Sequence, residues 1–322
     1  MSAQVAVVMV ARGEPAARLQ RALDALAAQV GCDPFTVYIA APEADHASMQ
    51  ALVTDRAVSA VVPVANPGGA RCAGLNLAIR AADADVVVRV DARSRVHPDH
   101  VARCVARLAD DANVGVVGGV QWPHALTEDA GERGTVRALR NRWLLGNAGY
   151  RRPGASGPVD TVYLGAFRRR ELLDLGGYDE RLDANEDFEL CSRYRDAGAV
   201  VWLEENLLVD YEPRVGTAAL FAQYQAFGEA KVTYWRTTGD RPNGRQLLAL
   251  GLAGGGTLAL LGSIRRPRRA AALVAVGVVA VAVIDQLADP HEPDPQVRAR
   301  ACVASMATTA GWLWGVAHGA LR

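Results

Sequence analysis

Two groups of charged residues in this sequence have the types and the spacing to do chemistry. The first ends an apolar, β-branched run, Val86–Val90, which is interrupted only by Arg89 and followed by Asp91. The second is the consecutive pair Glu186 and Asp187. A carboxylate at a strand end can meet a metal ion or a polar substrate, and an ionised carboxylate at a helix start can act as a general base.

The apolar run before Asp91 predicts a central strand of a parallel sheet, buried on both faces. Ligands of open α/β sheets bind outside the carboxyl ends of the strands, where Asp91 stands. Because side chains alternate along a strand, Arg89 and Asp91 are expected on the same face. The simpler interpretation is that Asp91 only ends the strand and begins a turn.

The segment Gly176–Gly198 predicts a helix that begins near Asn185 or Asp183. Glu186 and Asp187 fall in its first turn, where the helix dipole stabilises an acid by roughly 0.3–1 kcal/mol. Helix stability is therefore one sufficient explanation for both acids. The same dipole keeps a carboxylate ionised, which a general base requires.

Strands and helices alternate up to about residue 121, which predicts an α/β fold with a mostly parallel sheet and helices on both faces. No GxGxxG follows the first strand and no GxxxxGK[ST] occurs, so the usual dinucleotide and P-loop phosphate sites are missing. Strands are expected at 5–10, 36–41, 58–64, 86–90, 114–121, 159–167, 200–203 and 207–211. Helices are expected from about Pro15 to Val30, at 71–82, 98–109 and 136–145, in part of 48–56, and after Arg214 through about 235.

Composition excludes several classes of function. The 35 basic and 35 acidic residues cancel, so no basic field favours a nucleic-acid partner. The five cysteines are scattered without CxxC spacing, which argues against a zinc site or a disulfide framework and fits a reducing compartment. The amino terminus runs directly into a strand-like segment, so we expect no signal peptide.

The last third of the chain is hydrophobic. Gln246–Ile264 and Ala301–Leu321 carry no charge and approach membrane-spanning length, whereas Ala270–Ile284 reaches it only with its flanks. Four arginines within 265–269 separate Gln246–Ile264 from Ala270–Ile284. If Gln246–Ile264 crossed the membrane from the cytoplasm, these arginines would lie on the outer side, against the positive-inside tendency. A re-entrant or interfacial segment and a hairpin packed on the protein are the alternatives. We expect a membrane contact through 246–321.

Two longer stretches carry a family resemblance. NPGGARCAGLNLAIRAADADVVVRVDARSRVHPDHV, Asn66–Val101, resembles the donor half of family 2 glycosyltransferases of the GT-A fold. VDTVYLGAFRRRELLDLGGYDERLDANEDFELCSRYRDAG, Val159–Gly198, resembles their acceptor half. The R-V-D-A strand end and the N-E-D helix start resemble the succinoglycan-biosynthesis type of membrane-bound glucosyltransferases. The resemblance covers roughly residues 4–235, with its motifs in the family's order.

The resemblance implies inverting transfer of a sugar from a nucleotide diphosphate donor to a hydroxyl of a lipid-linked or polysaccharide acceptor. Asp187 would be the general base with Glu186 beside it, and Asp91 would hold Mg²⁺ or Mn²⁺ on the diphosphate side. The other nucleotide-sugar-side positions are Arg12, Glu14, Glu43, Asn76, Arg89, Arg93 and Arg214, and the acceptor-side positions are Asp160, Arg168, Gln223 and Tyr224.

The implied organisation is a glycosyltransferase domain over 1–240 and a hydrophobic helical region over 241–322. The domain would divide into a nucleotide-sugar-binding half, 1–121, and an acceptor half, 122–240. The catalytic domain is expected on the cytoplasmic side of a membrane, with no nucleic-acid partner.

The chain departs from the family at three places. Family members carry Asp-x-Asp or Asp-x-His at the strand end, but this chain has Asp91-Ala92-Arg93, and a guanidinium has no lone pair for a metal. Either Asp91 holds the metal with donor phosphates and water, or Arg93 substitutes its own charge. An Asn-Glu pair is replaced by Arg12-Gly13-Glu14. The family's Asp-rich turn that binds uridine is replaced by a segment in which Glu43 or Asp45 could take over that contact.

Two rival functions follow from these departures. A non-catalytic GT-A-like scaffold in a membrane glycan-assembly complex would explain Arg93 and the altered nucleotide turns. A nucleotidyltransferase would share the sheet topology, but it usually opens with a Gly-rich basic loop, and ARGEPAAR supplies one glycine.

Overall fold

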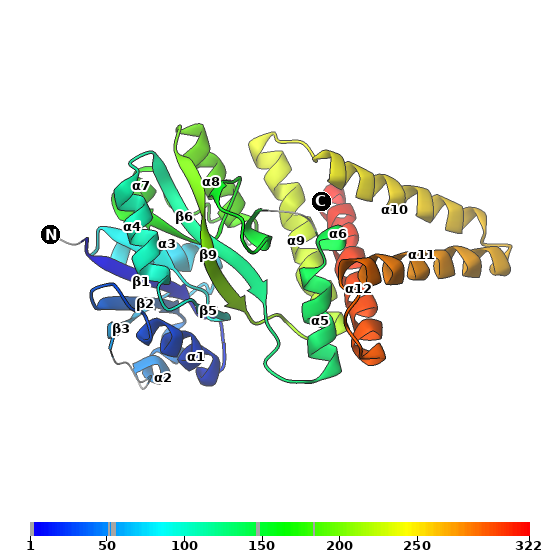
Figure 1. Cartoon of the computed structure of the whole chain (residues 1–322). Coiled ribbons are helices and arrows are strands. Elements are labelled where there is room, and N and C mark those ends of the chain that lie inside the picture. The colour runs from blue at the N-terminus through cyan, green and yellow to red at the C-terminus, as the bar shows by residue number, and fades with distance from the viewer. Residues whose placement is uncertain (1–2, 51, 53–55, 146–148, 183) are drawn as a thin grey trace. The chain divides into compact units, whose positions relative to one another are not determined.

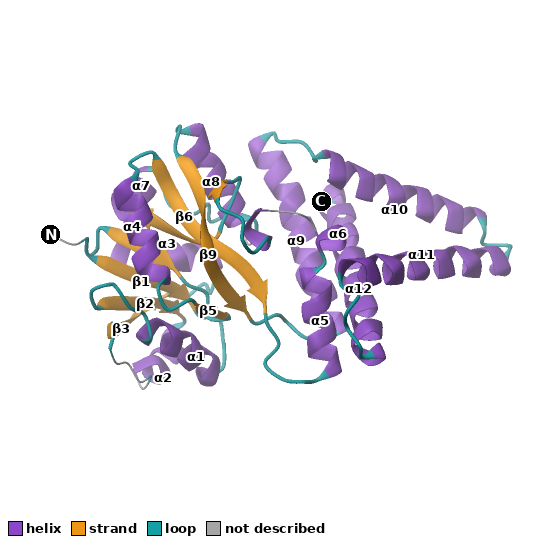
Figure 2. Cartoon of the chain, viewed as in Figure 1, coloured by secondary structure: helices purple, strands orange, loops and turns teal. Residues whose placement is uncertain are grey.

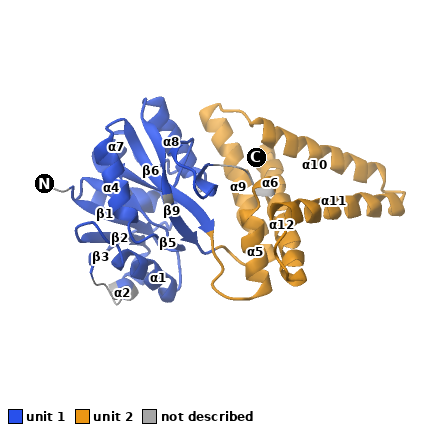
Figure 3. Cartoon of the chain, viewed as in Figure 1, with its two compact units in different colours: residues 1–122, 148–212 blue, residues 123–147, 213–322 orange. Residues whose placement is uncertain are grey.

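The structure is a computed structural model that describes residues 3–50, 52, 56–145, 149–182 and 184–322 (Figure 1). The chain forms two units: residues 1–122 with 148–212 make unit 1, and residues 123–147 with 213–322 make unit 2 (Figure 3). The functional boundary at residue 240 rests on the family resemblance and stays a prediction.

Unit 1 is built on one sheet with the strand order β3-β2-β1-β4-β8-β6-β9-β5, and β7 pairs with β9 (Figure 2). The first four strands of this order pair in parallel, whereas β8 runs antiparallel to β4 and β6. The predicted α/β class is confirmed. The strands are β1 Val5–Val10, β2 Phe35–Ala41, β3 Val58–Ala65, β4 Val86–Arg89, β5 Ser94–Val96, β6 Val114–Pro123, β7 Gly157–Pro158, β8 Tyr163–Arg168 and β9 Val200–Tyr211.

Helices cover both faces of this sheet, because each face buries its own apolar cluster. One cluster takes Leu23 and Leu26 from α1 and Leu108 from α4, and the other takes Leu75 from α3 and Leu190 from α8. The predicted coverage of both faces is therefore confirmed. The helices of unit 1 are α1 Ala16–Ala27, η1 Glu43–Asp45, α2 His46–Gln50, α3 Arg71–Ala81, α4 His100–Asp110, η2 Gly149–Arg151, α7 Arg169–Asp174 and α8 Glu186–Asp196.

Two differences from the predicted elements have physical causes. The two short strands expected at 200–203 and 207–211 are one strand, β9, because Glu204 between them is neutralised by Arg103 at 2.9 Å and Arg107 at 3.1 Å. The strand β5 is not predicted by the sequence pattern, since it forms only by pairing with β9. The predicted helix within 48–56 is described only as α2, and 51 and 53–55 lie outside the described residues.

Unit 2 is helical, and its last helix, α12, packs along α9. Glycines permit the approach: a Cβ on Gly315 would lie 2.0 Å from the Gln225 carbonyl oxygen, and one on Gly311 2.5 Å from that of Phe221. The expected apolar segment 301–321 is thus a helix packed within the protein. The helices of unit 2 are α5 Ala130–Arg140, α6 Arg142–Leu145, α9 Thr217–Thr238, α10 Gly244–Gly262, α11 Pro267–Ala288 and α12 Pro295–Leu321.

The helices α10 and α11 differ from α12 because their apolar side chains are exposed. Leu252 is 69% exposed and Val276 is 66% exposed, and none of the residues of α10 is buried. In the described part of the chain one helix, α11, is long and apolar enough to cross a membrane, with a mean hydropathy of 2.3. The candidate membrane-spanning helix therefore contains Ala270–Ile284, the shortest of the three apolar segments, because α11 also includes the residues that flank it.

Candidate active site

Arg89 is the centre of the candidate site. Its side chain is 1% exposed, and its guanidinium donates to carboxylates from two distant segments. Nε donates to Asp91 Oδ1 at 2.9 Å, Nη2 to Glu186 Oε1 at 3.0 Å, and Nη1 to Asp187 Oδ1. The structure therefore brings together the two groups of charged residues that the sequence separates by almost a hundred positions.

Two elements deliver these side chains. The strand β4 ends at Arg89, which carries the guanidinium to the carboxyl edge of the parallel strands. Helix α8 begins at Glu186, directly after Asn185, which adopts a left-handed backbone conformation with φ 63°. Asn185 occupies the predicted cap position, but its side chain makes no cap hydrogen bond, and Asp183 lies outside the described residues.

A second guanidinium, that of Arg71, approaches the same carboxylates. Arg71 is the first residue of α3, and its Nη1 lies 3.7 Å from Asp91 Oδ2 and 3.5 Å from Glu186 Oε1. We call Arg71, Arg89, Asp91, Glu186 and Asp187 the inner cluster. With every member ionised, its three carboxylates and two guanidiniums carry a net charge of −1.

The two aspartates of the inner cluster have opposite pKa shifts. Burial opposes ionisation of Asp91, but the neighbouring Arg89 and Arg71 outweigh it and lower the Asp91 pKa. Burial raises the pKa of Asp187 to about 7, against the opposing charge of Arg89. Asp91 is therefore ionised at neutral pH, while Asp187 titrates there and can take up a proton.

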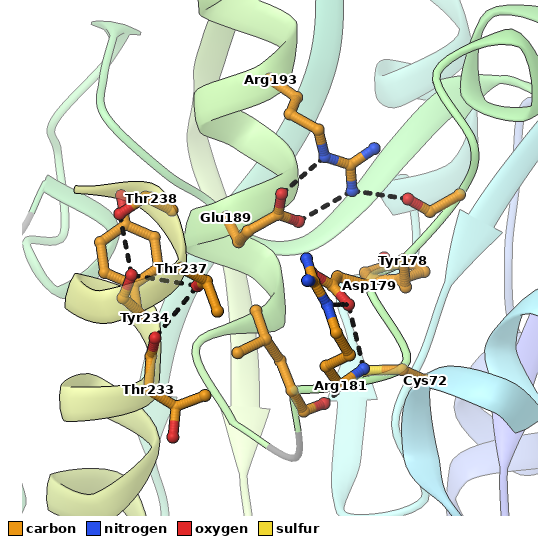
Figure 4. A network of polar contacts seen from close by, with 12 residues as sticks. Cys72, Tyr178, Asp179, Arg181, Glu189, Arg193, Thr233, Tyr234, Thr237 and Thr238 are labelled. Atoms are coloured by element: carbon orange, nitrogen blue, oxygen red, sulfur yellow. Dashed lines mark hydrogen bonds and ion pairs between the residues drawn. The ribbon is translucent and has the colours of Figure 1, made fainter. Parts of the chain in front are cut away.

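The turn before α8 is fixed by a second set of contacts (Figure 4). Arg193 donates to Glu189 at 2.6 Å and to the carbonyl oxygen of Gly177 at 2.6 Å, and Cys72 Sγ donates to the Leu182 carbonyl oxygen at 2.8 Å. These bonds hold the turn that carries Tyr178, whose ring lies 5.5 Å from the Arg89 guanidinium carbon. The turn therefore closes over Arg89 and excludes water from it.

Asn76, predicted on the nucleotide-sugar side, supports the same turn. Its side chain is 5% exposed, accepts from Tyr178 N at 2.8 Å and donates to Tyr178 O at 2.9 Å. Gly177 must be small there, because a Cβ on it would lie 2.5 Å from Asn76 Oδ1. The structure thus gives Asn76 a supporting position beneath the inner cluster.

Arg93 lies in a separate group around Glu212. The Glu212 carboxylate accepts from Arg18 at 2.8 Å and from Arg21 at 2.9 Å, and Arg93 Nη1 is 4.0 Å away. We call Arg18, Arg21, Arg93 and Glu212 the outer cluster. Its three guanidiniums and one carboxylate carry a net charge of +2.

A small pocket of about 40 Å³ lies at the carboxyl ends of β1 and β2. Glu14 and Asp45 both line it, so Asp45, and not Glu43, shares this pocket with Glu14. Glu43 is exposed in η1, and the side chain of Arg12 is exposed in the loop after β1. The role of either acid in base recognition stays a prediction.

Several predicted acceptor-side residues are not part of the inner cluster. Arg168 pairs in register with Val86, at the other end of β4 from Asp91, and donates to the Val114 carbonyl oxygen at 3.0 Å. Asp160 has a side chain 80% exposed and binds Arg195 at 3.1 Å. Gln223 and Tyr224 belong to unit 2, as does Arg214, which is predicted on the nucleotide-sugar side. Tyr224 is 9% exposed, with its ring centroid 5.3 Å from that of Phe227.

Comparison with known proteins assigns the class. The profile of glycosyl transferase family 2 matches residues 6–174, just over half of the chain, so this chain belongs to that family. The predicted family is confirmed.

A particular relative and a solved structure agree with this class. The chain is 29% identical over 192 residues, 58% of its length, to the succinoglycan biosynthesis protein ExoA of Rhizobium meliloti (strain 1021), and it spans 57% of that protein's length. Its fold is similar to that of the mannosyltransferase PcManGT from Pyrobaculum calidifontis, solved in complex with GDP-Man and Mn²⁺. The TM-score is 0.62 at 17% identity, over 96% of this chain and 87% of the other. The predicted GT-A fold is confirmed.

Proposed function

We propose that this chain transfers a sugar, with inversion, from a nucleotide diphosphate donor to a hydroxyl of a lipid-linked or polysaccharide acceptor. The observation that carries the proposal is the inner cluster, in which one buried guanidinium holds Asp91 and Asp187 together. The relative's role in succinoglycan biosynthesis supports a polysaccharide acceptor.

In this mechanism Asp187 is the general base. The acceptor oxygen attacks the anomeric carbon, its proton passes to Asp187, and the bond from the anomeric carbon to the diphosphate breaks. A pKa of about 7 suits this step, because proton transfer is most effective when the base titrates near the working pH. Arg89 contacts Oδ1 of Asp187, so we assign the proton to Oδ2.

The leaving diphosphate needs a cation, and a divalent metal at Asp91 is the prediction of the family resemblance. Both oxygens of Asp91 already lie within 3.3 Å of Arg89 nitrogens. Among the residues described here, no three His, Cys, Asp or Glu side chains group in a way that could hold a metal ion. These residues do not fit a metal held by protein ligands, and metal use by this chain stays a prediction.

We propose that the membrane contact is made by α10 and α11. The 22 residues of α11 extend about 33 Å, close to the thickness of a hydrocarbon core of about 30 Å. Arginines 265, 266, 268 and 269 join the two helices and suit anionic head groups at either interface. We place the catalytic unit on the cytoplasmic side, with α12 packed on α9 rather than in lipid.

The test of the function is Asp187→Asn in purified protein, assayed for sugar transfer from UDP- and GDP-sugars to membrane acceptors. We expect a loss of about 10²–10⁴-fold in rate, the usual contribution of a general base. Asp179→Asn is the matched control, since Asp179 is an acid that binds Arg181 outside the inner cluster. Wild-type rates in Asp187→Asn would favour the non-catalytic scaffold, which also predicts no turnover with any nucleotide sugar.

A further inference from the structure

The oxygens of Asp91 are already committed to arginines. Arg89 donates to Oδ1 at 2.9 Å and to Oδ2 at 3.3 Å, and Arg71 lies 3.7 Å from Oδ2. A divalent ion bound to Asp91 would have to displace the two guanidiniums or lie within a few ångströms of them. Positive charges that close together repel strongly in a partly buried site. Glu186 and Asp187 cannot replace Asp91 as an open ligand, since Arg89 binds both.

The positive charge that the leaving diphosphate needs is present on Arg93, two residues after Asp91. The outer cluster carries a net charge of +2, and its arginines reach solvent: their side chains are 18% (Arg18), 38% (Arg21) and 25% (Arg93) exposed. Glu212 stays ionised, since burial is outweighed by hydrogen bonds from Arg18 and Arg21 that lower its pKa. The three guanidiniums around Glu212 are therefore within reach of an anion that approaches from solvent.

The outer cluster is tied to the segment that carries Asp91. Glu212 N donates to the Arg93 carbonyl oxygen at 2.8 Å, and β5, which follows Arg93, pairs with β9, which precedes Glu212. The backbone of Arg93 is thus fixed two residues after Asp91, at the carboxyl edge of the parallel strands where ligands bind. A guanidinium presents a fork of N–H donors that matches two phosphate oxygens, which a hydrated ammonium does not.

We propose that this enzyme holds the donor diphosphate with guanidiniums instead of a divalent metal, and that Arg93, backed by Arg18 and Arg21, supplies the charge. The inference rests on the proposed function. As the bond between the anomeric carbon and the diphosphate oxygen breaks, its electron pair stays on the diphosphate, where Arg93 offsets it. The acceptor oxygen bonds to the anomeric carbon and releases its proton to Asp187.

The first experiment is calorimetric titration of the full-length protein with UDP and with GDP, in EDTA and then with Mn²⁺. We expect at least one nucleotide to bind in EDTA, with an affinity that Mn²⁺ changes by less than about threefold. Arg93→Gln should weaken that binding by about tenfold or more, which corresponds to 1.4 kcal/mol. Nucleotide binding that appears only with Mn²⁺ overturns the proposal, as does unchanged binding by Arg93→Gln.

A substitution that restores the second acid sharpens this test. Arg93→Asp should abolish nucleotide binding in EDTA and regain part of it when Mn²⁺ is added, with protein-bound Mn²⁺ visible by electron paramagnetic resonance. Arg95→Asp is the matched control, because Arg95 lies on the same strand, is 35% exposed and pairs with Asp210 at 3.5 Å. Arg95→Asp should leave nucleotide affinity unchanged. If Arg93→Asp does not fold, Arg18→Gln replaces it and should weaken binding in EDTA by several-fold.

The nucleotide-binding measurements need no acceptor. Together with the sugar-transfer assay they therefore separate the arginine site from the proposed transfer function. Metal-free nucleotide binding that depends on Arg93, without sugar transfer, would support the arginine site and overturn the transfer function. Sugar transfer that EDTA abolishes would support the function and overturn the arginine site.

Discussion

Two buried arginines, one in each unit, show what separates a structural cation from a functional one. Arg137 on α5 has a side chain 5% exposed, and its nitrogens bind Asp285 at 2.8 Å, Asp289 at 2.8 Å and the carbonyl oxygens of both residues. Arg89 is equally buried, but the hydrogen bonds described for its guanidinium go to side-chain carboxylates. Two of them reach solvent, with side chains 25% (Asp91) and 29% (Asp187) exposed.

The difference lies in what a substrate can replace. Two partners of Arg137 are backbone carbonyls at the end of α11, which no ligand displaces, so Arg137 is a permanent tie between α5 and α11. The partners of Arg89 are side-chain carboxylates, and in the proposed function Asp187 presents its second oxygen to the acceptor while the guanidinium holds Oδ1. Burial alone therefore does not identify a functional arginine, whereas the chemistry of its partners does.

The largest expected effect is on stability, in Arg137→Met. Removing one partner of a buried ion pair leaves unpaired charge, so the free energy of unfolding of unit 2 should fall by about 3–5 kcal/mol. Denaturant unfolding in detergent measures it. Arg133→Met is the control on the same helix, since Arg133 is 32% exposed and its pair with Glu292 at 3.1 Å should contribute less than about 1 kcal/mol. Equal losses in both variants would contradict the comparison.

Arg89→Met should act on catalysis as well as on stability, because it too leaves buried carboxylates unpaired. Without the guanidinium, Asp187 loses its fixed orientation, and a misplaced catalytic group costs about 100-fold in kcat. Donor KM should change less than kcat, since we place the diphosphate on Arg93. Circular dichroism and the unfolding midpoint check that the fold is kept. A normal kcat in a folded Arg89→Met protein would show that Arg89 is structural, like Arg137.

The pH dependence of kcat/KM gives a finer test of the role of Arg89. The base form of Asp187 is needed, so kcat/KM should rise with pH and level off above about pH 7. Arg89 lowers the Asp187 pKa against burial, so Arg89→Met should move the inflection to higher pH. The folded-state pKa lies above the usual value of about 3.9, so Asp187 favours folding at acid pH, and that contribution is lost as pH rises through about 7. An inflection unmoved in Arg89→Met would mean that another group titrates.

The smallest effect is expected for an exposed ion pair. Asp160→Asn breaks a contact with Arg195 in which the Asp160 side chain is 80% exposed. The unfolding midpoint should therefore move by less than the error of the measurement. Acceptor KM should rise if Asp160 has the acceptor-side role predicted from the sequence, and an unchanged KM would remove that role.

Local periodicity explains which parts of the site the sequence could predict. The alternation of a strand puts Arg89 and Asp91 on one face, and the start of a helix exposes Glu186 and Asp187. Arg71 and Tyr178 could not be found this way, because they join Arg89 only through the packing of α3 and the turn before α8. Their local signals, an NPGG turn before a helix and a GGY turn, do not say what they contact.

Hydropathy has the same limit in the last third of the chain. The segments that become α11 and α12 are both apolar, and composition does not distinguish a helix that faces lipid from one that faces protein. The distinction depends on whether another helix has a matching glycine: a Cβ on Gly228 of α9 would lie 2.3 Å from the Trp312 carbonyl oxygen. That match joins residues far apart in the sequence.

The packing of α12 on α9 also determines how the chain can be shortened. A truncation after residue 240 would remove the hydrophobic helices but would also strip α9 of the surface that buries Leu220 and Val232. Replacing residues 244–284 by a short flexible linker would keep α12 and the Asp285 partner of Arg137, and would remove most of the exposed apolar surface. A protein made in this way is the one to test for crystallisation and for nucleotide binding without detergent.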